Sequence, residues 1–146
     1  ANVAQLVNNL HCLFLAGGEN CIETPTFHVF DMFKTHQNGT AIKTVAENND
    51  ALDARISVSA SVKDGVMTVT LANCNCAEDA EVSLNLLGGT YAGKATVTTL
   101  KGEAMNSHNT FEAPNAVAPT EVSDVALDGA ITVPAAGVVS VRVAIA

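Results

Sequence analysis

The chain contains no tryptophan, a single tyrosine and only seven lysines and arginines among its 146 residues. Because the chain has 15 aspartates and glutamates against these seven cations, its net charge is −8, which argues against a nucleic-acid or anionic-membrane partner. No apolar run approaches the roughly 18 residues that a membrane span needs, and no basic segment followed by an apolar one forms a leader. We therefore expect no nucleic acid and no membrane among its partners. A hydrophobic content of 48% is sufficient for a packed core and excludes disorder.

Cysteine is also scarce. Four cysteines, Cys12, Cys21, Cys74 and Cys76, are too few for a disulfide framework in a chain of this length. Cys74 and Cys76 flank one residue, and no second pair stands at metal-ligand spacing. The sequence thus predicts reduced thiols without a metal or another cofactor, which favours a cytoplasmic protein. The four histidines are too scattered to suggest a metal site: His11, His28, His36 and His108.

Residues 24–36 have the features of a complete helix. Thr24 is a good N-cap, Pro25 suits the first helical position, and Asn38-Gly39 provides a stop. Phe27, Phe30 and Phe33 form an apolar arc that Val29 and Met32 widen past half the circumference. A helix this apolar must be covered on more than one side, so we expect it to pack between two bodies.

The segment before this helix allows two interpretations. Val3–Leu15 has apolar residues at helical spacing, with Gly17-Gly18 as a candidate cap, which favours an amphipathic helix. The alternative is a short buried strand over Val3–Val7 that leads into a loop. The chain begins at Ala1, without a Met and inside this patterned segment, which suggests a piece of something longer.

From residue 56 onward the apolar period changes to two. Ile56, Val58, Ala60 and Val62 alternate with Ser57, Ser59 and Ser61, which predicts a strand with one face buried and the serines facing water. Lys63–Gly65 predicts a hairpin turn. A polar linker over 40–55, which includes Glu47–Asp50, precedes them, with a short strand expected at Ala41–Val45. The strands predicted after the turn are one carrying Met67, Val69 and Leu71, then Val82–Leu86, Ala95–Leu100, Val122–Leu127, Ile131–Val133 and Val138–Ile145, the last with Ser140 and Arg142 facing outward. Seven short strands without intervening helices predict an antiparallel sandwich.

One connection, Lys101–Thr120, has no period and is long for a compact domain. We favour a polar loop tied down by asparagine side chains and anchored by Phe111. A loop that contacts a ligand is the alternative.

Three segments carry a specific resemblance: Ala4–Asn8, Thr24–Gln37 and Asn106–Asn115. In order and separation they resemble the C-terminal portion of α-L-arabinofuranosidases of glycoside hydrolase family 51. The middle segment, Thr-Pro-Thr-Phe-His-Val-Phe-Asp-Met-Phe-Lys, is the strongest and is close to the family's Thr-Pro-Thr-Tyr-His-Val-Phe-Glu-Met-Tyr-Lys. The resemblance covers essentially the whole chain.

The resemblance implies a mostly β fold, a jelly-roll-like antiparallel sandwich preceded by the last strand and helix of a (β/α)8 barrel. Residues 1–40 would be the C-terminal end of the catalytic barrel, with residues 1 to about 8 as its eighth strand in place of a helix at Val3–Leu15. Residues 41–146 would be the sandwich. The complete protein would be a retaining glycosidase that removes terminal α-L-arabinofuranosyl residues from arabinan- or arabinoxylan-type saccharides, and we expect it to be a homo-oligomer.

The resemblance also implies one site residue. Gln5 matches a family glutamine at the mouth of the eighth strand, where an amide hydrogen-bonds the bound arabinofuranose, and barrel active sites lie at that end of the strands. The two catalytic glutamates would lie on earlier barrel strands, outside this chain, so the chain carries no catalytic residue and should be inactive alone. Glu19, Glu23 and Asp31 match no catalytic position and are interpreted as solvated charges.

Two other classes of function remain open. A freestanding carbohydrate-binding module would grip sugars with exposed aromatic rings, which this composition hardly provides. A purely structural or oligomerisation role suits residues 41–146.

Overall fold

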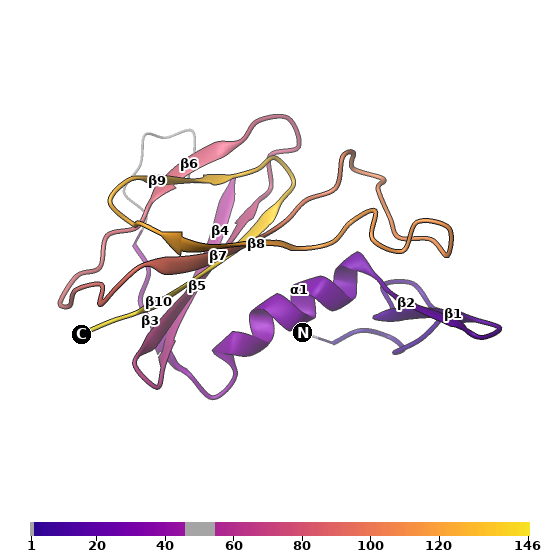
Figure 1. The fold of residues 1–146 in the computed structure, drawn as a ribbon, viewed down its shortest axis with the longest axis horizontal. Helices are drawn as coiled ribbons and strands as arrows, with labels where there is room; N and C mark the ends of the chain where they lie inside the picture. Colours follow the sequence, from indigo (N-terminus) through magenta and orange to yellow (C-terminus); the bar gives the residue numbers. More distant parts are fainter. Residues whose placement is uncertain (1, 46–54) are drawn as a thin grey trace.

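The computed structural model describes residues 2–45 and 55–146. The elements follow one another as β1 (Phe14–Gly17), β2 (Asn20–Glu23), α1 (Pro25–Phe33), the 3₁₀ helix η1 (Lys34–His36), β3 (Thr40–Ile42), β4 (Ile56–Lys63), β5 (Val66–Asn73), β6 (Ala80–Ser83), β7 (Ala95–Leu100), β8 (Thr120–Val125), β9 (Ala130–Val133) and β10 (Val138–Ala144). The fold is mostly β with antiparallel pairing, as predicted (Figure 1).

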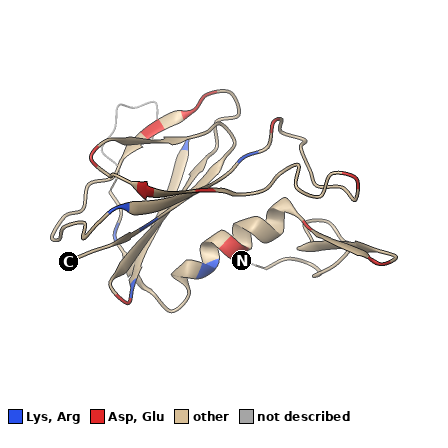
Figure 2. Ribbon diagram, viewed as in Figure 1, with Lys and Arg blue, Asp and Glu red and all other residues tan. Residues whose placement is uncertain are grey.

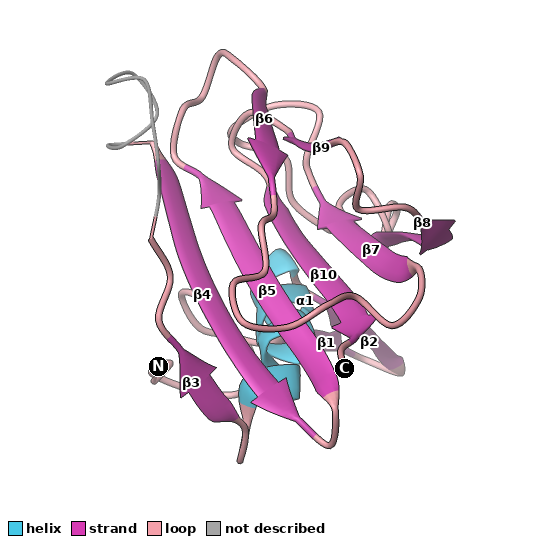
Figure 3. Cartoon of the chain, turned by 90° about the vertical axis from the view of Figure 1, so that its left-hand side faces the viewer, coloured by secondary structure: helices cyan, strands magenta, loops and turns pink. Residues whose placement is uncertain are grey.

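A six-stranded sheet in the order β3-β4-β5-β10-β7-β8 forms the centre of the molecule. The two-stranded sheet β6-β9 packs over one face, and α1 lies across the opposite face (Figure 3). The hairpin β1-β2 extends from the N-terminal end of α1, beside the long connection between β7 and β8 (Figure 1). The central sheet is therefore covered from both sides.

The main core lies between the six-stranded sheet and β6-β9. Val139, Val141 and Val143 of β10 point into it and are almost fully buried, opposite Val69 and Met67 of β5. This is the predicted inward set, since every second residue of a strand shares a face. The remaining buried members of this core are Leu71, Ala95, Val97, Ile131 and Val133.

The other face of the sheet is rich in serine and threonine. Here the prediction that the serines would face water is wrong for two of them, because Ser61 and Ser140 are buried beneath the helical segment, as is Thr70. Arg142, farther along the same face, is exposed as predicted. The alternation of apolar and polar residues along the strands predicted that these hydroxyl groups face solvent, but the helical segment from another part of the chain covers them.

The predicted helix is confirmed, with a shorter α-helical part. Thr24 caps it by accepting a hydrogen bond from Phe27 N at 3.3 Å, and Pro25 is at the start. Its last predicted turn is the 3₁₀ helix η1. The expectation of cover on two sides is also confirmed: Phe27 stacks on Phe14 with ring centroids 5.1 Å apart, while Met32 packs in a second core with Leu100 and Val117.

Both interpretations of the first 15 residues are wrong as stated. Neither a helix over Val3–Leu15 nor a strand over Val3–Val7 forms; Val7 makes a single parallel bridge to Phe14, and residues 14–23 are the β1-β2 hairpin. Asn8 and His11 have φ of 53° and 59°, a left-handed conformation that interrupts a helix. The expected cap, Gly17-Gly18, is instead at the hairpin turn.

The seven predicted strands correspond to β4–β10, with shifted bounds. β6 ends at Ser83, earlier than predicted, and β8 starts at Thr120, two residues before Val122. Asp64 and Gly65 both have positive φ, which is the conformation of a two-residue hairpin turn. β3 confirms the short strand, whereas the linker prediction at Glu47–Asp50 lies outside the described residues.

Candidate functional site

Gln5, the predicted sugar-binding residue, lies on an exposed stretch ahead of the first hairpin. The next residue is held firmly: the carbonyl of Leu6 accepts hydrogen bonds from Leu13 N at 3.0 Å and Phe14 N at 3.1 Å. Gln5 is thus attached to a fixed backbone while its amide is presented outward. An exposed amide with donors and an acceptor can bind sugar hydroxyls.

Asn8 ties this stretch to the hairpin. Its side-chain Nδ2 donates to Ala16 O at 2.8 Å, and its Oδ1 accepts from Ala16 N at 2.8 Å. Asn8 N also donates to Phe14 O at 3.1 Å. The asparagine amide therefore pairs with β1 as the backbone of a neighbouring strand would. The backbone of Asn8 is left-handed, a conformation that asparagine tolerates better than most residues.

Thr24 ties the same region to the helix. Its hydroxyl donates to Cys12 O at 2.6 Å, and its backbone N donates to Leu13 O at 3.0 Å. The same hydroxyl oxygen caps α1. One buried threonine thereby fixes the helix start against the turn that follows Asn8.

Asn109 ties the long loop of the sandwich to the hairpin. Its Nδ2 donates to Glu23 O and to Val117 O, both at 3.0 Å, and its Oδ1 accepts from Val117 N at 2.7 Å. The side chain is 2% exposed, so these bonds are shielded from water. The sequence indicated a loop held by asparagines, but not that one of them reaches across to β2. In the sequence, this contact is indicated only by the presence of a polar residue, Asn109, in a loop that has no apolar period.

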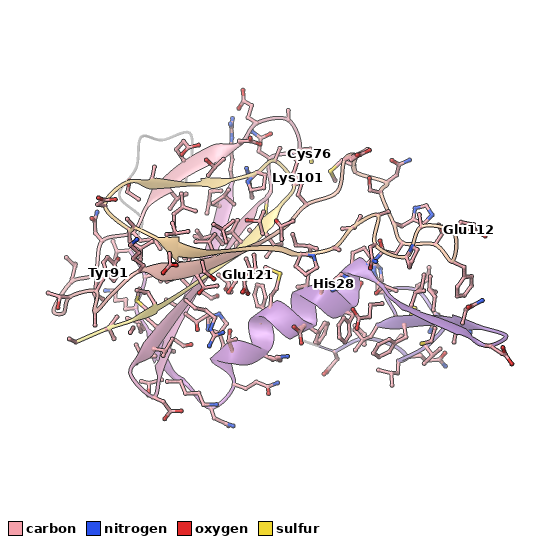
Figure 4. The ribbon with its side chains drawn as sticks, in the orientation of Figure 1. His28, Cys76, Tyr91, Lys101, Glu112 and Glu121 are labelled. Carbon is pink, nitrogen blue, oxygen red and sulfur yellow. The ribbon has the colours of Figure 1, made fainter. Side chains whose placement is uncertain are left out.

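The long loop has no strand between residues 101 and 119 and runs beside the hairpin (Figures 1 and 4). Phe111 is a half-exposed anchor: a Cβ at Gly17 would lie 3.2 Å from its ring carbon Cζ, so the ring lies close to the glycine backbone. Glu112, labelled in Figure 4, lies near the far end of the loop. The prediction of a tied-down loop is confirmed through Asn109.

The remaining polar residues of the helix region have structural environments. His28 is buried, with Nδ1 3.8 Å from the Glu23 carboxylate, and its Nε2 finds no hydrogen-bond partner among the described residues. His36 is held between two hydroxyls, with Nδ1 2.7 Å from Ser61 Oγ and Nε2 3.1 Å from Thr70 Oγ1. Burial lowers the pKa of His36 below its usual value.

The acidic residues are spread along the fold and do not gather at one place in the ribbon (Figure 2). Glu19, Glu23 and Asp31 are exposed, and Asp31 pairs with Lys34 one turn along α1. Over residues 2–45 and 55–146, no three His, Cys, Asp or Glu side chains gather as metal ligands do. All four cysteines are free thiols, and only Cys12 is buried. No helix in these two ranges is long and apolar enough to cross a membrane.

A groove of about 440 Å³ lies between the start of α1 and the root of the long loop. Its walls include Pro25, Val29, Lys101, Met105 and Cys76. Figure 4 shows Lys101 and Cys76 near each other where the loop leaves the sandwich. A smaller hollow of about 330 Å³ is lined by Glu103, Asn106, Ser107, His108 and Ala116. Gln5 is not among the described residues that line these two hollows, and it lies on the open surface.

The fold and this arrangement define an accessory β-sandwich domain joined to a helix-and-hairpin segment. The chain matches the model of the alpha-L-arabinofuranosidase C-terminal domain over residues 1–136. It is 36% identical over 135 residues to an intracellular exo-alpha-L-arabinofuranosidase from Bacteroides ovatus, a match that covers 88% of this chain and 26% of that protein.

Solved structures show the same similarity. The glycoside hydrolase family 51 arabinofuranosidase from Xanthomonas axonopodis pv. citri superposes with a TM-score of 0.80 at 27% identity, over 96% of this chain and 30% of that one. The alpha-L-arabinofuranosidase from Thermotoga maritima in its arabinose complex gives 0.77 at 23% identity, over 97% and 33%, which supports the fold alone. The chain belongs to the alpha-L-arabinofuranosidase C-terminal domain family, and it spans about a quarter of the curated relative's length.

Proposed function

We propose that the chain is the C-terminal portion of a retaining α-L-arabinofuranosidase of glycoside hydrolase family 51. The complete protein removes terminal α-L-arabinofuranosyl residues from arabinan- or arabinoxylan-type saccharides. The observation that carries this proposal is the family match over residues 1–136, together with 36% identity to a relative named as exo-acting.

Within that enzyme, residues 1–40 are the end of a (β/α)8 barrel and residues 41–146 are the sandwich. Two observations support this division. The sandwich has a closed core of its own, whereas Leu6 and Leu10 ahead of the hairpin are 57% and 80% exposed. In the complete enzyme, neighbouring barrel strands would pair with the open edge of residues 2–7, and the barrel would cover the exposed leucines.

Gln5 then hydrogen-bonds the arabinofuranose at the mouth of the barrel. Its support is its place on an exposed stretch whose following backbone is clamped to Leu13 and Phe14. A retaining glycosidase needs two carboxyl groups about 5–5.5 Å apart, one as nucleophile and one as acid and base. Glu19, Glu23 and Asp31 match no catalytic position of the family, so we expect both groups elsewhere in the complete protein.

A freestanding carbohydrate-binding module is the weaker alternative. The Tyr91 hydroxyl donates to Leu84 O at 2.8 Å with its ring half-buried, and Phe111 lies against Gly17. Tyr91 therefore lacks the open aromatic face that such modules use, and the partly exposed ring of Phe111 (44%) is the sole phenylalanine in residues 55–146. We expect the complete enzyme to be cytoplasmic and homo-oligomeric; the name of the relative supports the first expectation.

The test compares the complete protein with the 146-residue chain on an aryl α-L-arabinofuranoside. We expect turnover by the complete protein with retention at the anomeric carbon, seen by NMR of the first product. The chain alone should be lower by several powers of ten, because it lacks both carboxyl groups. Turnover by the purified chain, or none by the complete protein, contradicts the proposal.

A further inference from the structure

We propose that Asn109 is a positioning residue for the arabinofuranosidase: from the sandwich loop it fixes the β1-β2 hairpin and, through it, the stretch that carries Gln5. This inference rests on the proposed function, because it presumes that Gln5 binds the sugar. It assigns the sandwich a part in shaping the sugar site.

The first link is the hydrogen bond from Asn109 Nδ2 to Glu23 O, which joins residues 86 positions apart in the sequence. Asn109 is held in turn by Val117, which both accepts from Nδ2 and donates to Oδ1. With both donors and the acceptor engaged and the side chain buried, the amide has one orientation. A buried, satisfied amide of this kind transmits position from loop to hairpin.

The second link runs across the hairpin. Glu23 is the strand partner of Phe14 in the β1-β2 register. Phe14 N donates to Leu6 O at 3.1 Å, and Phe14 also forms the bridge to Val7. Leu6, which accepts this hydrogen bond, is the residue next to Gln5 in the sequence. The path from the buried amide to the candidate sugar-binding residue therefore passes through the Glu23–Phe14 strand pair and the hydrogen bond from Phe14 N to Leu6 O.

For the reaction rate, the exact position of the Gln5 amide is more important than the overall stability of the hairpin. A misplacement of about 1 Å in a group that orients substrate can cost about 10²-fold in rate. Gln5 itself is exposed and has no buried side-chain environment to hold it. Its geometry therefore depends on the backbone, which the hairpin holds from the sandwich side through the bonds to Leu6 O and which barrel strands hold from the other side in the proposed complete enzyme.

The sandwich offers a matched control in Asn73. Its Nδ2 donates to Glu78 O at 2.9 Å and Val133 O at 3.1 Å, and its Oδ1 accepts from Asn75 N at 2.9 Å. It is 3% exposed, against 2% for Asn109. The two asparagines thus have the same burial and the same set of bonds, but every partner of Asn73 lies within the sandwich.

The experiment measures kcat and KM of the complete protein with Gln5→Ala, Asn109→Ala, Asn73→Ala and the double variant Gln5→Ala/Asn109→Ala. We expect Asn109→Ala to lower kcat/KM by roughly ten- to a hundredfold, and Asn73→Ala to leave it unchanged at a similar loss of Tm. In the Gln5→Ala background the effect of Asn109→Ala should disappear, because both changes act on one contact. Amide hydrogen exchange over residues 6–16 should rise in Asn109→Ala and stay unchanged in Asn73→Ala.

Several outcomes overturn the inference. Equal losses from Asn109→Ala and Asn73→Ala would mean a structural role only, and additive losses in the double variant would mean that Asn109 does not act through Gln5. If Gln5→Ala alone changes nothing, the sugar-binding role of Gln5 fails and the inference with it. Absence of any arabinofuranosidase activity in the unaltered protein is a separate result, since it removes the proposed function itself.

If Asn109→Ala does not fold, Asn8→Gly tests the second half of the inference, namely that the hairpin fixes the stretch that carries Gln5. Asn8 is exposed, and glycine accepts its φ of 53° while removing both side-chain bonds to Ala16. We expect the same non-additive loss with Gln5→Ala. A variant that is folded and fully active overturns the inference.

Discussion

The sandwich and the N-terminal segment are held together by different forces. In residues 55–146, two layers of alternating side chains enclose a core in which Val133, Val139 and Val141 are fully buried. In residues 2–37, the buried apolar residues are Cys12 and Met32, while Leu6, Val7 and Leu10 are exposed. Met32 packs α1 onto the sandwich, whereas the part of the segment ahead of α1 is fixed mainly by directional hydrogen bonds from Asn8, Thr24 and Asn109.

This difference shows what each region requires. Burial stabilises a region without dictating fine geometry, since it is roughly proportional to area. Hydrogen bonds to backbone groups contribute only about 0.5–1.5 kcal/mol each, but they set register and angle. The N-terminal segment has defined geometry and little burial, as expected for a region whose apolar side chains need further protein to cover them.

The comparison is tested most strongly by removing the N-terminal segment. We expect the 146-residue chain to self-associate through the exposed side chains of Leu6 and Leu10, because each large apolar side chain left in water costs about 1.5–3 kcal/mol. A chain starting at Thr40 should be folded and monomeric, since much of the sheet face that it uncovers is lined by serine and threonine. Size-exclusion chromatography with light scattering measures both masses.

A matched control keeps the full length and changes Leu6 and Leu10 to serine. That variant should return to the monomer while keeping the circular dichroism of the parent chain. A monomeric parent at the same concentration would contradict the prediction. The structure does not have the alternative helix over Val3–Leu15, because Asn8 and His11 adopt a left-handed backbone and β1 begins at Phe14.

Two leucines compare the regions at a single side chain. Leu71 of β5 is 1% exposed, and Leu71→Ala should destabilise the chain by about 2–5 kcal/mol through lost burial and a cavity. Leu10→Ala makes the same chemical change at an exposed position and should stay within about 0.5 kcal/mol. Urea denaturation at a concentration where the chain is monomeric gives both values. Similar losses for the two would show that the N-terminal segment has a core after all.

The two regions also differ in how far the sequence predicted them. β4–β10 followed from period-two alternation, because successive residues of a strand point to opposite faces of the sheet and one face carries the main apolar core. Ser61 and Ser140 were assigned wrongly because the helical segment of α1 and η1, from far away in the sequence, covers this face of the sheet. The helix followed from Thr24 and Pro25, which act locally. In the site, Gln5 came from family resemblance, whereas the reach of Asn109 to Glu23 is a long-range contact that no spacing encodes.

Gln5 and Gln37, the two glutamines of the chain, are both exposed, so the same substitution at each compares a candidate sugar-binding amide with an ordinary surface amide. In the complete protein, Gln5→Ala should weaken transition-state binding by roughly 1–3 kcal/mol, the cost of leaving a hydrogen-bond partner unsatisfied. Gln37→Ala, at the far end of the helical segment, should leave kcat/KM unchanged. Neither should move Tm appreciably. Unchanged kcat/KM in Gln5→Ala would return Gln5 to the status of a surface amide.

The smallest expected effect lies where the two regions meet, at His36. Both ring nitrogens contact hydroxyls of the sheet, Ser61 and Thr70, and Phe33 lies beside the ring, 6.0 Å between centroids. The nearby charged groups are the cations Lys34 and Lys63, the latter hydrogen-bonded to Gln37 O at 3.3 Å. Burial lowers the folded-state pKa of His36 below its ordinary value of 6.5. The unfolded chain therefore binds more protons than the folded one between these two values.

It follows that the contribution of His36 is present in full above the unfolded-state pKa and is lost as the pH falls through the lower folded-state pKa. We expect the urea midpoint of the monomeric chain to fall between about pH 7.5 and pH 5.5. His36→Gln should flatten that dependence, whereas His108→Gln, at an exposed histidine whose Nδ1 contacts Asn106 O, should preserve it. If His36→Gln keeps the full dependence, the junction between helix and sheet is insensitive to protonation, and the hydroxyls of Ser61 and Thr70 accommodate the imidazolium as two acceptors without cost.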